Sequence, residues 1–99
     1  MEKRIKTSQY FYVLLCCDGS FYGGYTVDID RRLNEHNRGI GAKYTRTRTP
    51  VKLLYYCEYE TKKEAMQAEY SFKQLTRKKK EAFLREVGVD YEAASKFSE

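Results

Sequence analysis

The chain has 99 residues and a net charge of +5, with ten tyrosines and no tryptophan. This length predicts one domain with a single modest core, and a hydrophobic content of 41% excludes a disordered chain. No apolar run approaches the roughly 18 residues of a membrane span, and the N-terminus lacks the apolar region of a signal peptide. We therefore expect a cytoplasmic protein with no membrane partner. The positive charge favours an anionic partner, and nucleic acid is the commonest one for a small basic domain.

Residues 10–26 predict a β-hairpin, because two runs of strand-forming residues flank a short break with turn chemistry. The first run, 10–17, is apolar at nearly every position, which is typical of a strand buried on both faces, so we expect it at the centre of the sheet. The second run, 21–26, contains two consecutive glycines. Such glycines indicate either a bulge or a close backbone approach that leaves room for a phosphate or a metal.

The position of the turn decides whether Tyr12 and Tyr22 share a face of the sheet. With a three-residue loop, 18–20, Cys16 would lie opposite Tyr22, and Tyr12 would lie opposite Thr26. This register places the two tyrosines on the same face, offset along the strands. A loop with an even number of residues would place them on opposite faces.

Residues 28–39 predict a helix that ends at a glycine. If Ile29 marks the direction of the core, Leu33 and His36 point nearly the same way, and Arg32 lies at the edge of that stripe. Two interpretations of His36 remain open, a structural histidine with a satisfied ring and a functional one. Arg32 is likewise either a solvated surface residue or a member of a site.

The loop that follows, 38–50, alternates basic residues with threonines. This composition suits phosphate contacts that position a duplex without reading its sequence, although an ordinary solvated loop would look similar. The candidate contacts are Lys43, Arg46 and Arg48. A third strand is expected over 51–59, and its alternate residues from Val51 to Tyr59 are expected to share one face.

Thr61 and Glu64 form a capping-box pattern that predicts the start of a helix. The apolar stripe of this helix consists of Ala65, Ala68, Phe72 and Leu75. Glu69 lies on the same stripe, where an ionised carboxylate is unfavourable unless it is paired or bound to a cation. Either Lys73 pairs with it one turn later, or Glu69 holds a cation. Lys73 is also a candidate for nucleic-acid contact.

A last helix is expected over 77–87, opening on four consecutive basic residues. This run is either a solvated face or an extension of the basic surface, in which Arg77 and Lys78 would contact nucleic acid.

The predicted fold is α+β, a small antiparallel three-stranded sheet flanked by helices. We expect a polar lead-in over 1–9, the domain over 10–87 and a C-terminal tail over 88–99.

Three residues at fixed spacing resemble the motifs of the GIY-YIG nuclease domain. Tyr12 is followed after ten residues by Tyr22, which opens a Tyr-Gly-Gly element, and Arg32 follows after ten more. The segment 30–46 further resembles the small stand-alone bacterial members of this family. The resemblance covers nearly the whole chain.

The sequence departs from the family pattern at three points. Tyr10 stands where the first motif has glycine, and Gly23 stands where the second has isoleucine. Neither position supplies a catalytic side chain in the family. Some members carry an asparagine after the metal-binding glutamate, and residues 77–87 contain no clear counterpart.

The resemblance implies an endonuclease that hydrolyses phosphodiester bonds with one divalent cation, Mg²⁺ or Mn²⁺. Glu69 would be the metal ligand, and Tyr12 would be the general base with Tyr22 assisting. Arg32 would contact the scissile phosphate, and His36 would contact phosphate or relay protons.

We expect DNA rather than RNA as the substrate, with low sequence specificity or a protein partner that supplies it. The oligomeric state is left open. The alternative is a non-catalytic binding module for structured DNA or RNA, although phosphate binding gains nothing from the carboxylate of Glu69. A protein-interaction adaptor would explain neither the charge nor the tyrosines.

Overall fold

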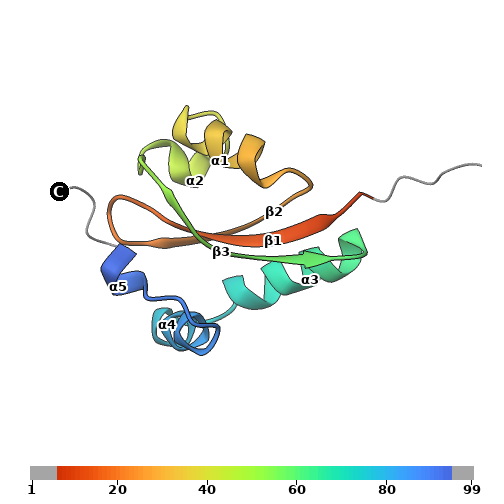
Figure 1. The fold of residues 1–99 in the computed structure, drawn as a ribbon. Helices are drawn as coiled ribbons and strands as arrows, with labels where there is room; N and C mark the ends of the chain where they lie inside the picture. The colour runs from red at the N-terminus through yellow and green to blue at the C-terminus, as the bar shows by residue number, and fades with distance from the viewer. Residues whose placement is uncertain (1–6, 95–99) are drawn as a thin grey trace, which may run out of the picture.

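The structure is a computed structural model that describes residues 7–94. An antiparallel sheet in the order β2-β1-β3 consists of β1 (Gln9–Leu15), β2 (Phe21–Thr26) and β3 (Lys52–Tyr59). One face is covered by α1 (Ile29–Asn37) and α2 (Lys43–Arg46), and the other by α3 (Lys62–Lys73), α4 (Arg77–Glu86) and α5 (Tyr91–Ala94) (Figure 1). The predicted α+β fold is confirmed.

The turn between β1 and β2 is a three-residue loop, but it begins one residue earlier than predicted. The Cys16 amide donates to the Ser20 carbonyl at 2.8 Å, and the Gly19 amide donates to the Cys16 carbonyl at 2.9 Å. Gly19 has a φ of +87°, the left-handed conformation that closes such loops. The paired residues Cys16 and Ser20 therefore enclose a loop of residues 17–19, and Gly19 occupies its last position.

This shift of the turn changes the cross-strand pairs without changing the faces. Tyr12 lies opposite Gly24 rather than Thr26, and Tyr22 lies opposite Leu14 rather than Cys16, so both predicted pairings were wrong. The loop has an odd number of residues, which is what a shared face requires. The observed partner of each tyrosine is two residues away from the predicted one. Tyr12 and Tyr22 consequently share a face.

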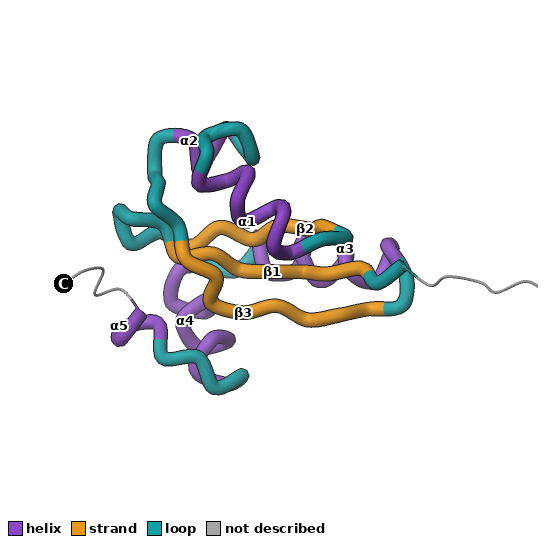
Figure 2. Tube along the Cα trace, turned by 45° about the horizontal axis from the view of Figure 1, so that its top comes forward, coloured by secondary structure: helices purple, strands orange, loops and turns teal. Residues whose placement is uncertain are grey.

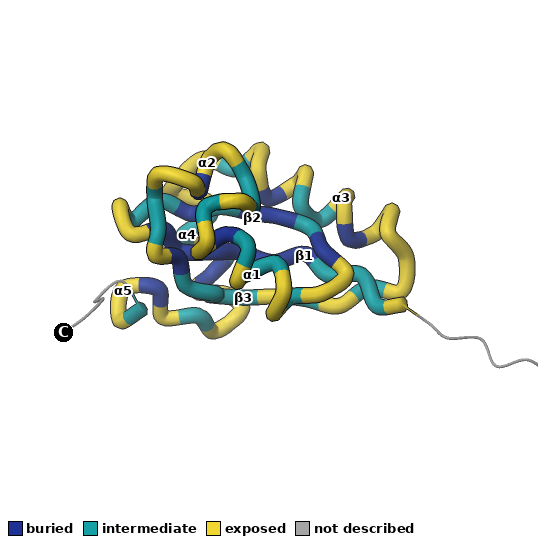
Figure 3. The backbone as a smooth tube through the Cα atoms, turned by 90° about the horizontal axis from the view of Figure 1, so that it is seen from above, coloured by how far each residue is buried: buried dark blue, intermediate teal, exposed yellow. Residues whose placement is uncertain are grey.

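Strand β1 is buried on both faces and lies between its two neighbours, as predicted (Figures 2 and 3). The core cluster on the α3 side consists of Phe11, Val13, Leu15, Phe21, Phe72, Leu84 and Tyr91. The cluster on the α1 side consists of Tyr12, Leu14, Cys16 and Val51. Tyr12 belongs to the smaller, α1-side cluster, and the partly buried Tyr22 packs against it.

A bulge interrupts the alternation of β3. Val13 pairs with Tyr55, but the next residue, Leu14, pairs with Leu53, so Leu54 is an extra residue. The predicted single face for the alternate residues of this strand was therefore wrong, because a bulge exchanges the two faces. Of the alternate residues, Val51 and Leu53 before the bulge pack on the α1 side, whereas Tyr55 and Tyr59 after it pack on the α3 side.

The three longer helices begin at side-chain caps, of which Thr61 was predicted. The side chains of Asp28, Thr61 and Thr76 each accept a hydrogen bond from the backbone amide three residues later, at 3.1, 3.1 and 3.2 Å. These bonds satisfy amides that a helix leaves without an internal partner.

Helix α5 lies inside the predicted C-terminal tail. Tyr91 is buried and meets the Phe21 ring edge to face, with ring centroids 5.5 Å apart. Packed structure thus extends past the boundary predicted at residue 87. The predicted lead-in contributes Gln9 to β1, while residues 1–6 and 95–99 lie outside the described part of the chain. Within residues 7–94, the helices are too short and too polar to cross a lipid bilayer.

Candidate active site

Tyr12 and His36 meet in the layer between the sheet and α1. The Tyr12 hydroxyl lies 2.8 Å from His36 Nε2, and the two residues are 3% and 0% exposed. Only two residues separate the end of β2 from the start of α1, so the helix returns across the sheet and carries its buried His36 over β1. In this position the histidine ring faces protein groups rather than the surface.

Two glycines make room for this pair. A Cβ atom on Gly24 would lie 2.3 Å from the Tyr12 hydroxyl, and one on Gly41 would lie 2.7 Å from His36 Nδ1. On the other face, a Cβ on Gly23 would lie 2.9 Å from the Phe72 ring. The β1–β2 register is regular at both β2 glycines, so they accommodate close side chains rather than form a bulge.

Burial controls the protonation of both partners. It raises the pKa of the Tyr12 hydroxyl to about 12, although Arg32 favours the ionised form. It also lowers the pKa of His36 to about 4, with a smaller contribution from the positive charge of Arg32. At neutral pH the tyrosine therefore carries its proton and the histidine is uncharged.

Tyr22 lies beside the same histidine. Its ring centroid is 5.3 Å from that of His36, and it stacks on Tyr44 at 5.8 Å with an interplanar angle of 19°. Tyr12 contacts the histidine ring at a centroid distance of 5.9 Å. The two predicted tyrosines thus both contact the predicted histidine.

Arg32 is held next to this cluster. Its Nη1 donates to Glu35 at 2.8 Å and its Nη2 donates to the Gly41 carbonyl at 2.7 Å. A guanidinium has five donors, so these two bonds leave others for a further acceptor. The half-buried side chain is thereby fixed at the edge of the site.

Glu69 lies on α3, which covers the opposite face of the sheet. Its side chain is 19% exposed, and its Oε2 lies 3.1 Å from Lys73 Nζ. Lys73 Nζ in turn lies 5.4 Å from the Tyr22 ring centroid. Lys73 therefore lies between this carboxylate and the Tyr22 ring. Burial raises the pKa of Tyr12 most, the charge of Tyr22 raises it less, and the negative charge of Glu69 makes the smallest contribution.

The six predicted nucleic-acid contacts divide into two groups. All of them except the half-buried Arg48 are exposed, and Arg48, Lys73 and Arg77 form ion pairs. Lys73 is paired with Glu69, while Arg48 pairs with Asp18 at 3.0 Å and Arg77 pairs with Glu81 at 2.9 Å. The paired arginines also hold the hairpin together: the Arg77 Nη1 donates to the Gly19 carbonyl at 2.8 Å.

Two residues of α2 belong to the site although the sequence did not single them out. Tyr44 stacks on Tyr22 and lies under the Arg48 guanidinium at 3.9 Å. The Thr45 hydroxyl oxygen lies 2.7 Å from His36 Nδ1. A helix of one turn is too short to show a periodic pattern in the sequence. The only sequence feature that could have pointed to Tyr44 and Thr45 was their position in the basic loop.

Buried His36 should make stability depend on pH. Its pKa is about 4 in the folded state and about 6.5 when unfolded, so acid favours the unfolded chain, which binds the proton first. This stabilisation is complete above pH 6.5 and is lost as the pH falls towards 4. We expect the free energy of unfolding to fall by about 2 kcal/mol between pH 7 and pH 5.

Urea denaturation at the two pH values measures this effect, and His36→Gln is the control. His36→Gln should show little difference in the free energy of unfolding between pH 7 and pH 5. The described carboxylates with lowered pKa values, Asp18 and Glu81, titrate below pH 5 and do not contribute. Equal wild-type stability at pH 7 and pH 5 would contradict the burial of an uncharged imidazole.

Comparison with known proteins identifies the family. The GIY-YIG catalytic domain matches residues 8–82, which is most of the chain. The protein therefore belongs to the GIY-YIG family. A UPF0213 protein of Bacillus velezensis is 63% identical over 86 residues, covering 87% of each chain. A UPF0213 protein of Bacillus licheniformis is 59% identical over 93 residues, covering 91% of this chain and 96% of the relative.

Two solution NMR structures share the fold. The UPF0213 protein of Bacillus halodurans has a TM-score of 0.58 at 47% identity, covering 92% of this chain and 97% of that one. A protein of E. faecalis has a TM-score of 0.57 at 55% identity, covering 88% and 91%.

Proposed function

We propose that this protein is an endonuclease that hydrolyses phosphodiester bonds, with DNA as its main substrate and Mg²⁺ or Mn²⁺ as its cofactor. The observation that carries this proposal is the 2.8 Å contact between the Tyr12 hydroxyl and His36 Nε2, beside Arg32. A purely structural core gains little from burying a tyrosine hydroxyl, an imidazole and nearby charges together.

The contact with His36 Nε2 offers a way for a protonated tyrosine to act as a base, because the imidazole can receive its proton. With a pKa of about 12, Tyr12 is protonated at neutral pH and cannot act as a free tyrosinate. An attacking water would instead give its proton to the Tyr12 oxygen while the tyrosine passes its own proton to His36. An approaching phosphate raises the pKa of the imidazole, which favours this transfer.

Arg32 and Tyr22 would hold the substrate. The remaining guanidinium donors of Arg32 match the geometry of phosphate oxygens and would balance the charge that develops on them. The Tyr22 side chain, fixed between His36 and Tyr44, would contact the phosphate beside the attacking water. His36 is fully buried, so the relay suits it better than direct phosphate contact.

Glu69 fits a cation held mainly by water and substrate. Within residues 7–94, no group of three or more His, Cys, Asp or Glu side chains could form a protein cage for a metal. Mg²⁺ commonly binds through one or two carboxylates together with waters and phosphate oxygens. Bound to Glu69, it would stabilise the charge on the phosphate and on the leaving oxygen. Lys73 would then give up its ion pair with this carboxylate.

Cleavage of labelled DNA tests the proposal. The panel should contain single-stranded, duplex, nicked, flap and branched DNA with an RNA counterpart of each, incubated with Mg²⁺, with Mn²⁺ or with chelator. We expect metal-dependent cleavage of at least one DNA, with little sequence preference. A protein that binds these structures but cleaves none of them would instead be a binding module.

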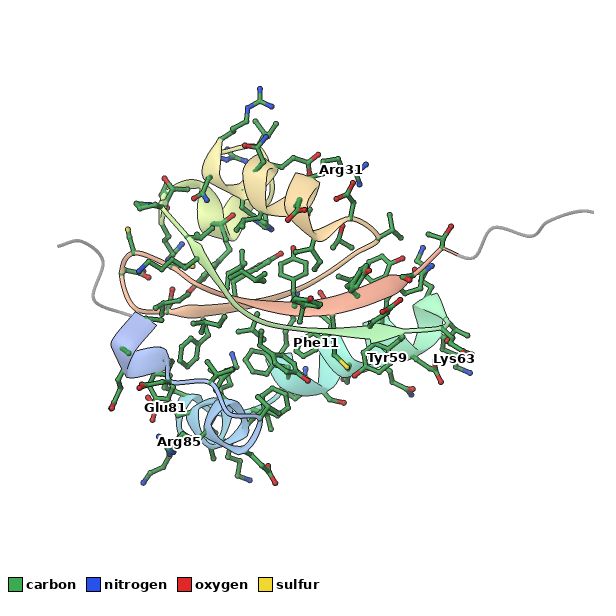
Figure 4. All side chains as sticks on the ribbon, in the orientation of Figure 1. Phe11, Arg31, Tyr59, Lys63, Glu81 and Arg85 are labelled. Carbon is green, nitrogen blue, oxygen red and sulfur yellow. The ribbon has the colours of Figure 1, made fainter. Side chains whose placement is uncertain are left out.

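Charge reversals should show where nucleic acid binds. Lys43→Glu and Arg46→Glu alter exposed residues of α2, close to the site. Each should weaken binding and reduce the slope of log affinity against log salt by about 1. Lys63→Glu makes the same charge change at the far end of α3 (Figure 4), so its slope should match that of the wild type. Equal effects of all three would indicate attraction by net charge alone.

A further inference from the structure

Thr45 is a fully buried polar residue to which the proposed reaction assigns no role. Its Oγ1 lies 2.7 Å from His36 Nδ1 and 3.2 Å from the Ala42 carbonyl oxygen. Gly41 allows this segment to approach the imidazole, because any Cβ there would clash with the ring. Arg32 also fastens the segment by donating to the Gly41 carbonyl.

The number of protons available decides the direction of each hydrogen bond. A carbonyl oxygen can only accept, so the one hydroxyl proton of Thr45 is donated to Ala42. The Thr45 oxygen must then accept from His36, and Nδ1 carries the ring proton. In an uncharged imidazole the other nitrogen, Nε2, is left with its lone pair. Tyr12 is therefore the donor in the contact with Nε2.

We infer that Thr45 is a positioning residue that holds His36 in its Nδ1–H tautomer and so directs the Tyr12 proton towards Nε2. This inference rests on the proposed function for its catalytic meaning. In the opposite tautomer, Nε2–H would donate to the Tyr12 oxygen. The tyrosine would then have no base to receive its proton, and the relay could not begin.

The tautomer can be observed directly, because the chain contains a single histidine. In the ¹⁵N-labelled full-length protein, long-range correlations between the ring protons and nitrogens distinguish the two tautomers without any assignment problem. We expect the Nδ1–H pattern in the wild type. Thr45→Ser keeps the hydroxyl and should preserve this pattern.

Thr45→Val keeps the shape of the side chain and removes the acceptor. A buried Nδ1–H would then lack a partner, so we expect the ring to shift to the Nε2–H tautomer. On the best substrate, cleavage by this variant should fall by roughly a hundredfold, the scale of a general acid–base contribution. The serine variant should cleave at a rate near that of the wild type.

The outcomes separate this inference from the proposed function. An Nε2–H ring in the wild type would overturn the inference, even if Thr45→Val did not fold. A valine variant with an unchanged Nδ1–H pattern would remove the role of Thr45. If the wild type shows Nδ1–H and cleaves nothing, the proposed function fails while the tautomer assignment stands.

Discussion

Replacing Glu69 by glutamine is expected to lower Mg²⁺-dependent cleavage by at least a hundredfold, roughly the effect of losing several kcal/mol of charge stabilisation at the phosphate. The amide keeps the shape of the side chain but cannot hold the cation as a carboxylate does. Affinity for nucleic acid without metal should hold or rise slightly, because a negative charge near the substrate has been removed. Cleavage rate, binding and thermal midpoint should be measured on the same preparation.

Two further variants make this result interpretable. Glu64→Gln makes the same change in the first turn of α3, away from the site, and should cleave like the wild type. Lys73→Gln breaks the same ion pair as Glu69→Gln while keeping the carboxylate. The Glu69–Lys73 pair is partly exposed and contributes about 1 kcal/mol or less to stability. Glu69→Gln and Lys73→Gln should therefore both keep nearly the wild-type thermal midpoint. If Glu69→Gln cleaved at the wild-type rate, Glu69 would be only the ion-pair partner of Lys73 and not a metal ligand.

Tyr12→Phe should lower the cleavage rate by roughly a hundred- to ten-thousandfold, the range of general acid–base catalysis. The ring remains, but the hydroxyl that links water to His36 is lost. The buried Nε2 would lack its partner, so the free energy of unfolding should fall by about 1–3 kcal/mol. Single-turnover cleavage with saturating protein separates this loss of rate from any change in binding.

Tyr56→Phe is the matched control on the same face of the sheet. Tyr56 lies directly opposite Tyr12 on β3 but is 54% exposed. Its variant should match the wild type in both cleavage and stability, because an exposed hydroxyl satisfies its hydrogen bonds with water. If Tyr12→Phe cleaved at the wild-type rate, the proton would have to leave by another route, and the relay would be wrong.

Local features of the sequence were sufficient to predict the three strands and the three longer helices, but not the one-turn helices α2 and α5, which lie where a loop and a tail were predicted. The capping box at Thr61 marked the start of α3 correctly, because a cap acts through a backbone amide only three residues away. The unbroken apolar run of β1 correctly indicated the central strand, since a strand between two others is covered on both faces.

Predictions that required pairing between distant segments were less accurate. The turn residue Gly19 was recognised, but its place within the loop was shifted by one residue. The bulge at Leu54 left no mark in the sequence, and it reversed the faces of half of β3. Both depend on how the strands fit together, and a shift of one residue is enough to change the outcome.

By itself, the sequence determined the residue types and spacing of the candidate site. Tyr12, Tyr22 and Arg32 stand ten residues apart, and an acidic residue on an apolar stripe singled out Glu69. These are properties of short segments, and each segment forms its element largely from local preferences.

Only the tertiary structure decided what those residues do to one another. The approach of α1 to the sheet buried His36 against the Tyr12 hydroxyl, and the turn of α2 placed Thr45 on the other ring nitrogen. Burial then changed the pKa of both partners. The fold also places Arg48 in an ion pair with Asp18 of the hairpin loop. Such contacts arise between segments far apart in the chain, and their strength depends on the exclusion of water, which no local pattern records.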